Sequence, residues 1–509
     1  MTMAATLDDV RKLLADEGVT DLSRFAEVLF ERTDRSLLTT YDAESLAAMA
    51  RQGLEFLAGS GGEPRVLVFN PDGAAGWRSP HTVIMLTLTD RPFIVDSVQA
   101  ELRRRGRPLY NQLHPIVSVS RNVTGELLHV GQEGGSPEAF ELFFVERMDD
   151  AEERADLQRG VEKVLGDVIL ATDDYRAMLQ RSADAEQYLE GLSATGVTGP
   201  LAVPKEDIDE YAAFMKWLDE DNFVFLGYRL YELLDVNGVK SLWANTESGL
   251  GVLRKLEDSG YVKPVPVEQL PEDLRERVTG GRLFLVTKAN AEATVHRPRR
   301  MDYVGVKRLD GAGAVLGEQR FIGLFTTKGL SAPVEEVPIL RLKLKQVLEL
   351  DQSIPGSHDY KAIVAAFSGM PREELFWSDA SQIHADIRTI LRLEQEQAVR
   401  LTLRADPLKR GVAVMVIMPR ARFSDEVRQR VQKYLTERLA AHRVDSRLAI
   451  GEDEGHARFH FFFATSERAT PELAEELEQT VARLARSWDE SFSRCSMSMT
   501  ARSGRVSAR

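Results

Sequence analysis

Cysteine is almost absent from this sequence: Cys495 is the single cysteine among 509 residues. An intrachain disulfide therefore cannot form, and a metal cluster held by several cysteine thiolates is excluded. Cys495 stands in a stretch rich in Ser and Arg with no evident base beside it, which favours an incidental exposed thiol. This cysteine usage suits a reducing compartment, so we expect a cytoplasmic location.

Long apolar runs and an excess of basic residues are also lacking. No segment reaches the roughly 18 to 20 apolar residues of a spanning helix, so we expect no membrane partner. The start MTMAATLDDVRKLLADEG carries acids where a secretory signal would carry bases, and its spacing is that of an amphipathic helix. With 79 acidic against 65 basic residues the formal net charge is −14, which argues against nucleic acid as the main partner.

Motifs for cofactor binding and catalysis are missing too. A dinucleotide-binding loop needs G-x-G-x-x-G between a strand and a helix. Gly249-Leu-Gly251 lacks the third glycine, and Gly311-Ala-Gly313 lies between two expected strands, as a hairpin turn would. The sequence contains no P-loop, no G-x-S-x-G and no H-E-x-x-H. We predict no catalytic residue and no cofactor site in this chain.

The most plausible metal ligands are His456 and His460, which point to the same side of an expected strand. Acidic residues precede them at 452–454. Two histidines fall short of the three or four ligands of a typical site, and a solvent-facing strand edge explains them. His114 and His296 could each orient a ligand, or could be satisfied structurally. We predict no metal site.

Hydrophobic spacing divides the chain into sheet-and-helix units joined by helices, so the expected fold class is α/β (α+β). In the first unit we expect helices on one face of the sheet, and in 191–204 a linker rich in small residues. The expected units are a helical N-terminal segment at 1–60, a first sheet-and-helix domain at 80–170, a mixed and mostly antiparallel sheet domain at 205–335, a helical connector at 336–397, a last sheet-and-helix domain at 398–490, built like the first, and a disordered tail at 491–509.

The turn TDRP at 89–92 is the ligand-binding candidate of the first domain. It joins an expected strand to an expected helix, and the unpaired N–H groups at a helix start can bind a carboxylate. Asp90, Arg91 and Asp96 are therefore candidate ligand-binding residues. Alternatively, Asp90 only caps the helix and Pro92 lies in its first turn.

TDRPFIVDSVQAELRRRG, with LHPIVSVSR after it, resembles the first ACT-type domain of the large bacterial NAD-specific glutamate dehydrogenases. Later segments are similar to the N-terminal half of the same family, in the same order over about residues 10–490: LDEDNFVFLGYRLYEL, TVHRPRRMDYVGVKRLDGAGAVLGEQRFIGLFTT, VPILRLKLKQVLE and VMVIMPRARFSDEVRQRVQKYL. The resemblance implies ACT-like and PAS-like modules joined by helices. It implies a first ACT-like domain at 80–170, a PAS-like or second ACT-like domain at 205–335 and a third ACT-like domain at 398–490. It also implies a large homo-oligomeric enzyme that uses NAD to deaminate glutamate to 2-oxoglutarate.

Two features depart from that family. Its catalytic lysine and nucleotide fingerprint have no matching positions in this chain. Amino-acid-binding ACT domains tend to have glycine after Asp-x-Pro, whereas this chain has Phe93, whose bulk could block a ligand.

The preferred hypothesis is the N-terminal regulatory and assembly half of a glutamate dehydrogenase, truncated or separated from its catalytic half. Matching residues stop at RSWDESF, before a Ser/Arg run such as a frameshift would produce. An amino acid is the possible effector, and a second copy or a catalytic region is the expected partner. The alternative is a free-standing ACT-type amino-acid sensor that binds a partner. A third hypothesis is that the chain is itself catalytic. We predict no turnover, because phosphate-cradling and proton-transfer groups are missing.

Overall fold

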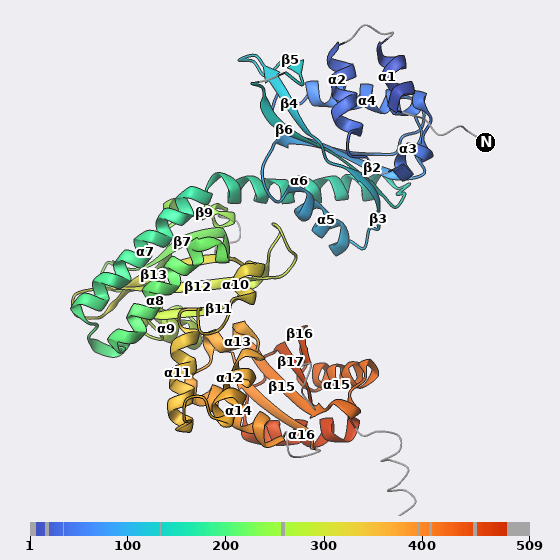
Figure 1. The fold of residues 1–509 in the computed structure, drawn as a ribbon. Helices are drawn as coiled ribbons and strands as arrows, with labels where there is room; N and C mark the ends of the chain where they lie inside the picture. Colours follow the sequence, from blue (N-terminus) through green and yellow to red (C-terminus); the bar gives the residue numbers. More distant parts are fainter. Residues whose placement is uncertain are drawn as a thin grey trace, which may run out of the picture.

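The computed structural model describes residues 7–15, 20–33, 35–132, 134–255, 260–393, 398–406, 410–450 and 456–485. Within these ranges, sheets and helices alternate along the chain (Figure 1). The expected α/β (α+β) class is confirmed. The tail expected at 491–509 lies outside the described residues. None of the helices described is both long and apolar enough to cross a membrane.

The first sheet is antiparallel and has the order β1-β2-β6-β4-β5, with β3 also paired to β6. Its strands are β1 (Arg65–Phe69), β2 (Thr82–Thr89), β3 (Leu109–Leu113), β4 (Ile116–Arg121), β5 (Leu127–Val130) and β6 (Ser136–Val145). β1 was not among the strands indicated by the sequence. Its register pairs Leu67 with Met85, so it continues the sheet on the far side of β2.

Helices cover both faces of this sheet, so the expectation of helices on one face is wrong. One face carries α1 (Leu7–Ala15), α2 (Thr20–Phe30), α3 (Arg35–Thr40) and α4 (Ala43–Ala58), and the other carries α5 (Ile94–Arg104) and α6 (Ala151–Asp173). Along β2, Val83 and Met85 join the core of the first set, whereas Ile84 and Leu86 join the core of the second. β2 is buried at every position except its last, so both of its faces need cover.

The middle sheet is antiparallel, in the order β10-β8-β7-β13-β12-β11, with β9 paired to β7. Its elements are α7 (Tyr175–Thr195), α8 (Lys205–Trp217), β7 (Phe223–Val236), β8 (Val239–Ala244), β9 (Leu250–Gly251), β10 (Val265–Pro266), α9 (Glu272–Thr279), β11 (Phe284–Glu292), β12 (Arg300–Leu309) and β13 (Val315–Phe325). Phe225 and Phe321 face the helix pair α7 and α8. The segment expected as a linker, 191–204, instead completes α7 and connects it to α8 within this unit.

The opposite face of the middle sheet shares a core with the first unit. Leu226, Ile322 and Leu324 belong to the same buried cluster as Leu165 and Val168 of α6. Figure 1 shows α6 running from beneath the first sheet to the middle sheet. The first two units are therefore joined by apolar burial.

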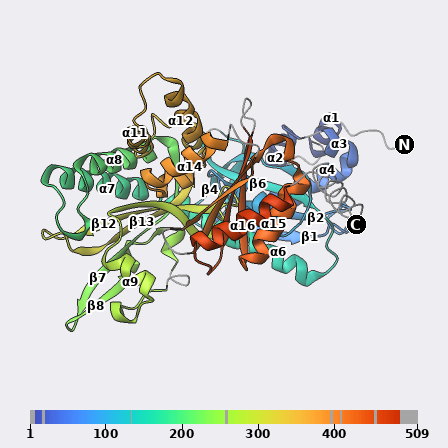
Figure 2. The ribbon, with the colours of Figure 1, turned by 90° about the horizontal axis from the view of Figure 1, so that it is seen from below.

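A helical segment follows, built from α10 (Thr327–Ser331), α11 (Leu340–Asp351), α12 (His358–Ser368), α13 (Arg372–Trp377) and α14 (Ala380–Leu393). The last sheet then forms in the order β14-β15-β17-β16. Its elements are β14 (Arg400–Ala405), β15 (Gly411–Pro419), α15 (Asp425–Arg438), β16 (Arg443–Ile450), β17 (His456–Ala464) and α16 (Pro471–Leu484). Figure 2 shows α15 and α16 lying side by side over this sheet.

The first and last sheets share one plan, as the sequence led us to expect. Each begins with an antiparallel hairpin (β1–β2 and β14–β15), continues into a helix, and ends with a strand that returns beside the second strand of the hairpin (β6 and β17). A long helix then packs on the sheet. The plan is repeated because each sheet must cover an apolar face with the helices that follow its strands.

Candidate functional site

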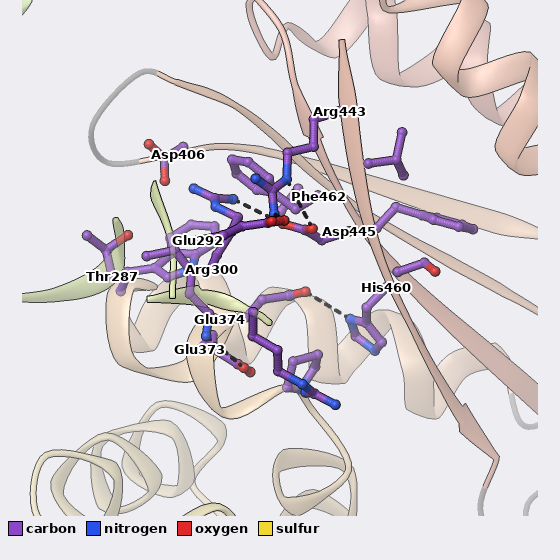
Figure 3. Close-up of a pocket in the computed structure, with 18 of the residues that line it drawn as sticks. Thr287, Glu292, Arg300, Glu373, Glu374, Asp406, Arg443, Asp445, His460 and Phe462 are labelled. Carbon is purple, nitrogen blue, oxygen red and sulfur yellow. Dashed lines mark hydrogen bonds and ion pairs between the residues drawn. The ribbon is translucent and has the colours of Figure 1, made fainter. Parts of the chain in front are cut away.

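A cavity of about 610 Å³ lies where the middle sheet, the helical segment and the last sheet meet (Figure 3). We call it the junction pocket. Its lining residues come from β11 and β12 (Lys288, Glu292, Arg300), from α13 (Glu373, Glu374), from the loop after β14 (Asp406) and from β16 and β17 (Arg443, Asp445, His460, Phe462), among others. Three separate units of the fold therefore contribute charged side chains to one cavity.

Strand alternation places the histidines of β17 on the pocket side of the last sheet. Phe459, Phe461 and Phe463 belong to the core under α15 and α16, so His456 and His460 point away from those helices. His460 is only 3% exposed and His456 only 6%. The expectation of a solvent-facing strand edge is wrong, because the helical segment covers this face.

His460 belongs to a buried chain of polar groups. Its Nδ1 lies 3.1 Å from Oε1 of Glu374, and the other oxygen of Glu374 is ion-paired with Arg404. Arg404 also lies 3.2 Å from Asp386 and donates a 2.7 Å hydrogen bond to Ser378. Burial raises the pKa of Asp386, and Arg404 opposes that rise. This chain of polar groups connects α13 and α14 to the last sheet.

The second ring nitrogen of His460 differs from Nδ1 in having no hydrogen-bond partner among the described residues. His460 Nε2 is buried and makes no hydrogen bond within the part of the chain that the structure describes. Because Glu374 can accept a hydrogen bond from Nδ1–H, Nε2 is left as an unsatisfied acceptor or donor at the pocket wall. Such a group is the kind that a bound ligand can satisfy.

Cations and carboxylates alternate around the rest of the junction pocket (Figure 3). Arg300 lies 3.2 Å from Asp445 and stacks over the Phe462 ring, with its guanidinium carbon 4.6 Å from the ring centroid. Arg443 lies 2.6 Å from Glu292. Burial lowers the pKa of Arg300, as does the nearby positive charge of Arg410, while Asp445 opposes them.

Lys288 completes the wall on the α13 side, 2.6 Å from Asp302 and 3.4 Å from Glu373. With Arg300 and Asp445 opposite, the pocket offers both signs of charge within one cavity. Such a lining suits a ligand that carries an ammonium and a carboxylate together. Groups of three or more His, Cys, Asp or Glu side chains arranged to hold a metal ion are not found in the described ranges.

The TDRP turn of the first unit lies apart from the junction pocket. Helix α5 begins at Ile94, and its N-cap is Phe93, without a side-chain cap. The alternative in which Asp90 caps the helix and Pro92 lies in its first turn is therefore wrong. The backbone N–H of Asp90 instead donates to the carbonyl of Pro137 at 3.0 Å. The chain enters the helix through a left-handed residue rather than through a capped turn.

Arg91 and Asp96 bond to neighbouring elements of the chain. Arg91 donates to Asp173 at 2.8 Å and to Thr172 at 3.0 Å, at the end of α6. The carboxylate of Asp96 lies 3.2 Å from Nδ1 of His296, in the loop before β12. That Asp90, Arg91 and Asp96 bind a ligand stays a prediction. In the structure, Arg91 holds the turn before α5 against α6, and Asp96 holds α5 against the middle unit.

Sequence reasoning missed the junction pocket. His460 was noted because it shares a strand face with His456. Glu374, Arg404 and Asp386 lie in segments for which the sequence predicted a helix or a strand and no functional role. A polar residue at a buried position of an amphipathic helix could have revealed it. Asp386 lies between Ile383 and Ile387 on the buried face of α14.

Models of three protein domains match this chain. Residues 25–161 match the ACT1 domain of glutamate dehydrogenase, residues 337–396 match its helical motif 1, and residues 400–489 match its ACT2 domain. The matches correspond to the first sheet with its helices, the helical segment and the last sheet with its helices. The junction pocket takes its α13 wall from the second match and its β16 and β17 wall from the third.

Whole-chain comparisons agree with these domain matches. The chain is 29% identical over 493 residues to an NAD-specific glutamate dehydrogenase of Pseudomonas aeruginosa, covering 94% of this chain and 29% of that protein. It is 33% identical over 432 residues to the enzyme of that name from Halomonas elongata, covering 84% of this chain and 26% of that protein. It is 27% identical over 426 residues to the protein of the same name from Mycobacterium tuberculosis, covering 82% of this chain and 24% of that protein. The chain thus spans 24–29% of the length of these relatives.

Proposed function

Because this chain is a region of the NAD-specific glutamate dehydrogenase family that carries the ACT1, helical motif 1 and ACT2 domains, we propose that it is the regulatory and assembly region of such an enzyme. The proposed reaction of the whole enzyme converts L-glutamate, NAD and water to 2-oxoglutarate, ammonia and NADH. We propose that the residues which bind NAD and perform this reaction lie outside the chain described here.

The junction pocket is the observation that carries the proposal. A ligand seated there would contact the middle sheet, α13 and the last sheet together, so its binding free energy would depend on how the three are arranged. The cavity of about 610 Å³ accommodates a small metabolite. Its alternating charges favour a zwitterion, and we propose a free amino acid as the effector.

Thermal unfolding of the whole 509-residue chain with each common amino acid tests this role. At least one amino acid should raise the melting temperature in a saturable way, because ligands that bind only the native state stabilise it. Arg300→Gln should abolish the rise, since it removes a cation from the pocket wall. Arg392→Gln, on the exposed side of α14, is the matched control and should preserve it. If no amino acid moves the transition, the effector role fails.

The ACT-domain matches also favour a free-standing amino-acid sensor, which would act through a partner protein. Isolating the chain from its native host, followed by mass measurement of the intact assembly, separates the two functions. A regulatory region should be isolated together with a catalytic region, as part of a homo-oligomeric enzyme. A free-standing sensor should be isolated without a catalytic region. A third role, catalysis by this chain alone, predicts NADH formation from glutamate, and we expect none.

Two further features belong to the same proposal. The middle sheet, with its helix pair on one face, is proposed as the PAS-like module between the two ACT domains. A cytoplasmic location is proposed from the single cysteine and from the NAD-dependent chemistry of the family.

A further inference from the structure

A second cavity, of about 440 Å³, lies on the face of the middle sheet that turns towards α6. Its walls are formed by strands β7, β12 and β13, by α6 and by the segment after β9. We call it the arginine pocket, because Arg229, Arg277 and Arg320 line it. It shares Lys288 and Glu292 with the junction pocket but takes these three arginines from β7, α9 and β13.

The arginine pocket contains two like charges directly opposite each other. The register of β7 and β13 pairs Arg229 with Arg320, so both side chains stand on the same face. Like charges at directly opposed positions of an antiparallel pair repel and destabilise the sheet. The repulsion is strong here because Arg229 is only 1% exposed.

The nearby carboxylate of Glu318 is already shared among several partners, Arg320 included. It lies 2.6 Å from Lys307 and 2.8 Å from Arg320, and it accepts a hydrogen bond from the Tyr303 hydroxyl. Although burial by itself raises the pKa of Glu318, Arg320, Lys307 and Arg277 hold it well below its ordinary value. Glu318 therefore stays ionised, and its one negative charge faces several cations.

The carboxylate of Asp167, on the α6 wall of the pocket, is also already paired. It lies 2.5 Å from Lys255 and accepts a 2.8 Å hydrogen bond from Thr294. The other carboxylate of the lining, Glu292, is ion-paired with Arg443, and among the described residues Arg277 and Arg320 share the charge of Glu318 with Lys307. Burying an excess of positive charge is costly unless an anion compensates it.

Arg229 and Arg277 also have unsatisfied donors. Among the described residues, Arg229 donates to the backbone carbonyls of Leu253 and Lys255, and its buried Nε has no partner there. The buried Nε of Arg277 likewise has none there. Arg320 is held in place by the Tyr231 ring, 3.6 Å from its guanidinium carbon to the ring centroid. The guanidinium groups are positioned before any ligand arrives.

We propose that the arginine pocket binds a small dianion, whose two negatively charged oxygen groups are held by Arg229, Arg277 and Arg320. Arginine suits this role because its planar donors match carboxylate and phosphate oxygens. Two sources share this chemistry, a dicarboxylate and a phosphate. These three arginines do not line the junction pocket, and the existence of the site does not depend on the role proposed for that pocket.

Succinate and inorganic phosphate are the probes, titrated separately into the whole chain in a calorimeter with chloride at equal ionic strength as the reference. Saturable binding of at least one dianion is expected, and the one that binds identifies the source. Arg277→Gln should weaken it at least tenfold, because its guanidinium is one of the three proposed to hold the dianion. Lys240→Gln, an exposed cation on β8, is the matched control and should leave the affinity unchanged.

Arg229→Gln provides a second, independent variant, with circular dichroism to show that it folds. Loss of dianion binding in both arginine variants, with Lys240→Gln unaffected, supports the site. The proposal is overturned if neither dianion binds more tightly than chloride. It is also overturned if Arg277→Gln binds as the unaltered chain does, or if Lys240→Gln weakens binding equally.

Discussion

At the scale of single residues, buried acids in this chain differ in whether a cation accompanies them. Asp302 lies 2.6 Å from Lys288, and Glu318 lies 2.6 Å from Lys307. Glu141 on β6 is 3% exposed, and its Oε2 has no hydrogen-bond partner among the described residues. Burial, with the negative charge of Asp90 nearby, raises the pKa of Glu141 to about 8.

Glu141 therefore makes a pH-dependent contribution to stability. Its pKa in the unfolded chain is about 4.3, so between about pH 4.5 and pH 8 the folded state binds more protons than the unfolded state. The free energy of unfolding consequently falls as pH rises through this window, by up to about 1.4 kcal/mol per pH unit. Glu141→Gln cannot ionise and should escape this loss, so its advantage over the unaltered chain should grow from pH 5 to pH 8.

Urea unfolding at several pH values measures this difference. Glu63→Gln, at an exposed position before β1, should show a difference that does not change with pH. If the difference in unfolding free energy between Glu141→Gln and the unaltered chain is also constant with pH, the Glu141 carboxyl is ionised in the folded protein and the prediction is wrong.

At the scale of elements, the entry to α5 departs from ordinary helix starts. Several other helices have a side-chain cap, for example α4 with Asp42, α15 with Ser424 and α16 with Thr470. At α5 the cap position is Phe93, with φ of 76°, in the left-handed region that favours glycine. The Phe93 ring lies 5.0 Å from the His296 ring, centroid to centroid. This contact with the middle unit compensates for the unfavourable backbone.

Replacing Phe93 by glycine and by alanine separates the two effects. Both variants lose the ring contact, but only Phe93→Gly relieves the backbone, so it should be more stable than Phe93→Ala by about 1 kcal/mol. The same pair at Gln99, in the middle of α5, should show the opposite order, because glycine costs about 1 kcal/mol relative to alanine inside a helix. Chemical denaturation of the four variants tests this. Alanine more stable than glycine at both positions would contradict it.

At the scale of the whole molecule, neighbouring units share buried clusters in addition to the cores of their own. One buried cluster joins Phe321 of the middle sheet, Ile387 of α14, and Met415 and Ile417 of the last sheet. Another joins α6 to the middle sheet. The junction pocket lies beside the first of these clusters, and the chain of Glu374, Arg404 and His460 closes its α13 side. We expect the polar chain to contribute substantially to how the units are held together.

Two neighbouring glutamates test this contribution. Glu374→Gln breaks a buried ion pair and should lower the free energy of unfolding by about 3 kcal/mol, the lower end for such a loss, because Asp386 still accompanies Arg404. Glu373→Gln removes a partly exposed partner of Lys288 and should cost less than about 1 kcal/mol. Denaturant unfolding monitored by tryptophan fluorescence measures both. Equal costs would show that the buried chain is not a structural tie.

The sequence determined the elements and many of the faces they bury. Alternation of Phe459, Phe461 and Phe463 placed His456 and His460 together on the other side of β17, and the apolar spacing predicted the α5 and α16 helices. These features could be predicted because they depend on local periodicity, which each element imposes on its own residues. The resemblance to glutamate dehydrogenases rested on the same local segments.

Only the tertiary structure decided what those faces meet. Whether His460 faces water or Glu374 depends on a helix 86 positions away in the chain. That Arg229 stands opposite Arg320 depends on the register of two strands whose spacing along the chain specifies no pairing. Both pockets are made where separate units pack, and long-range packing follows from the summed burial of many side chains rather than from any local pattern.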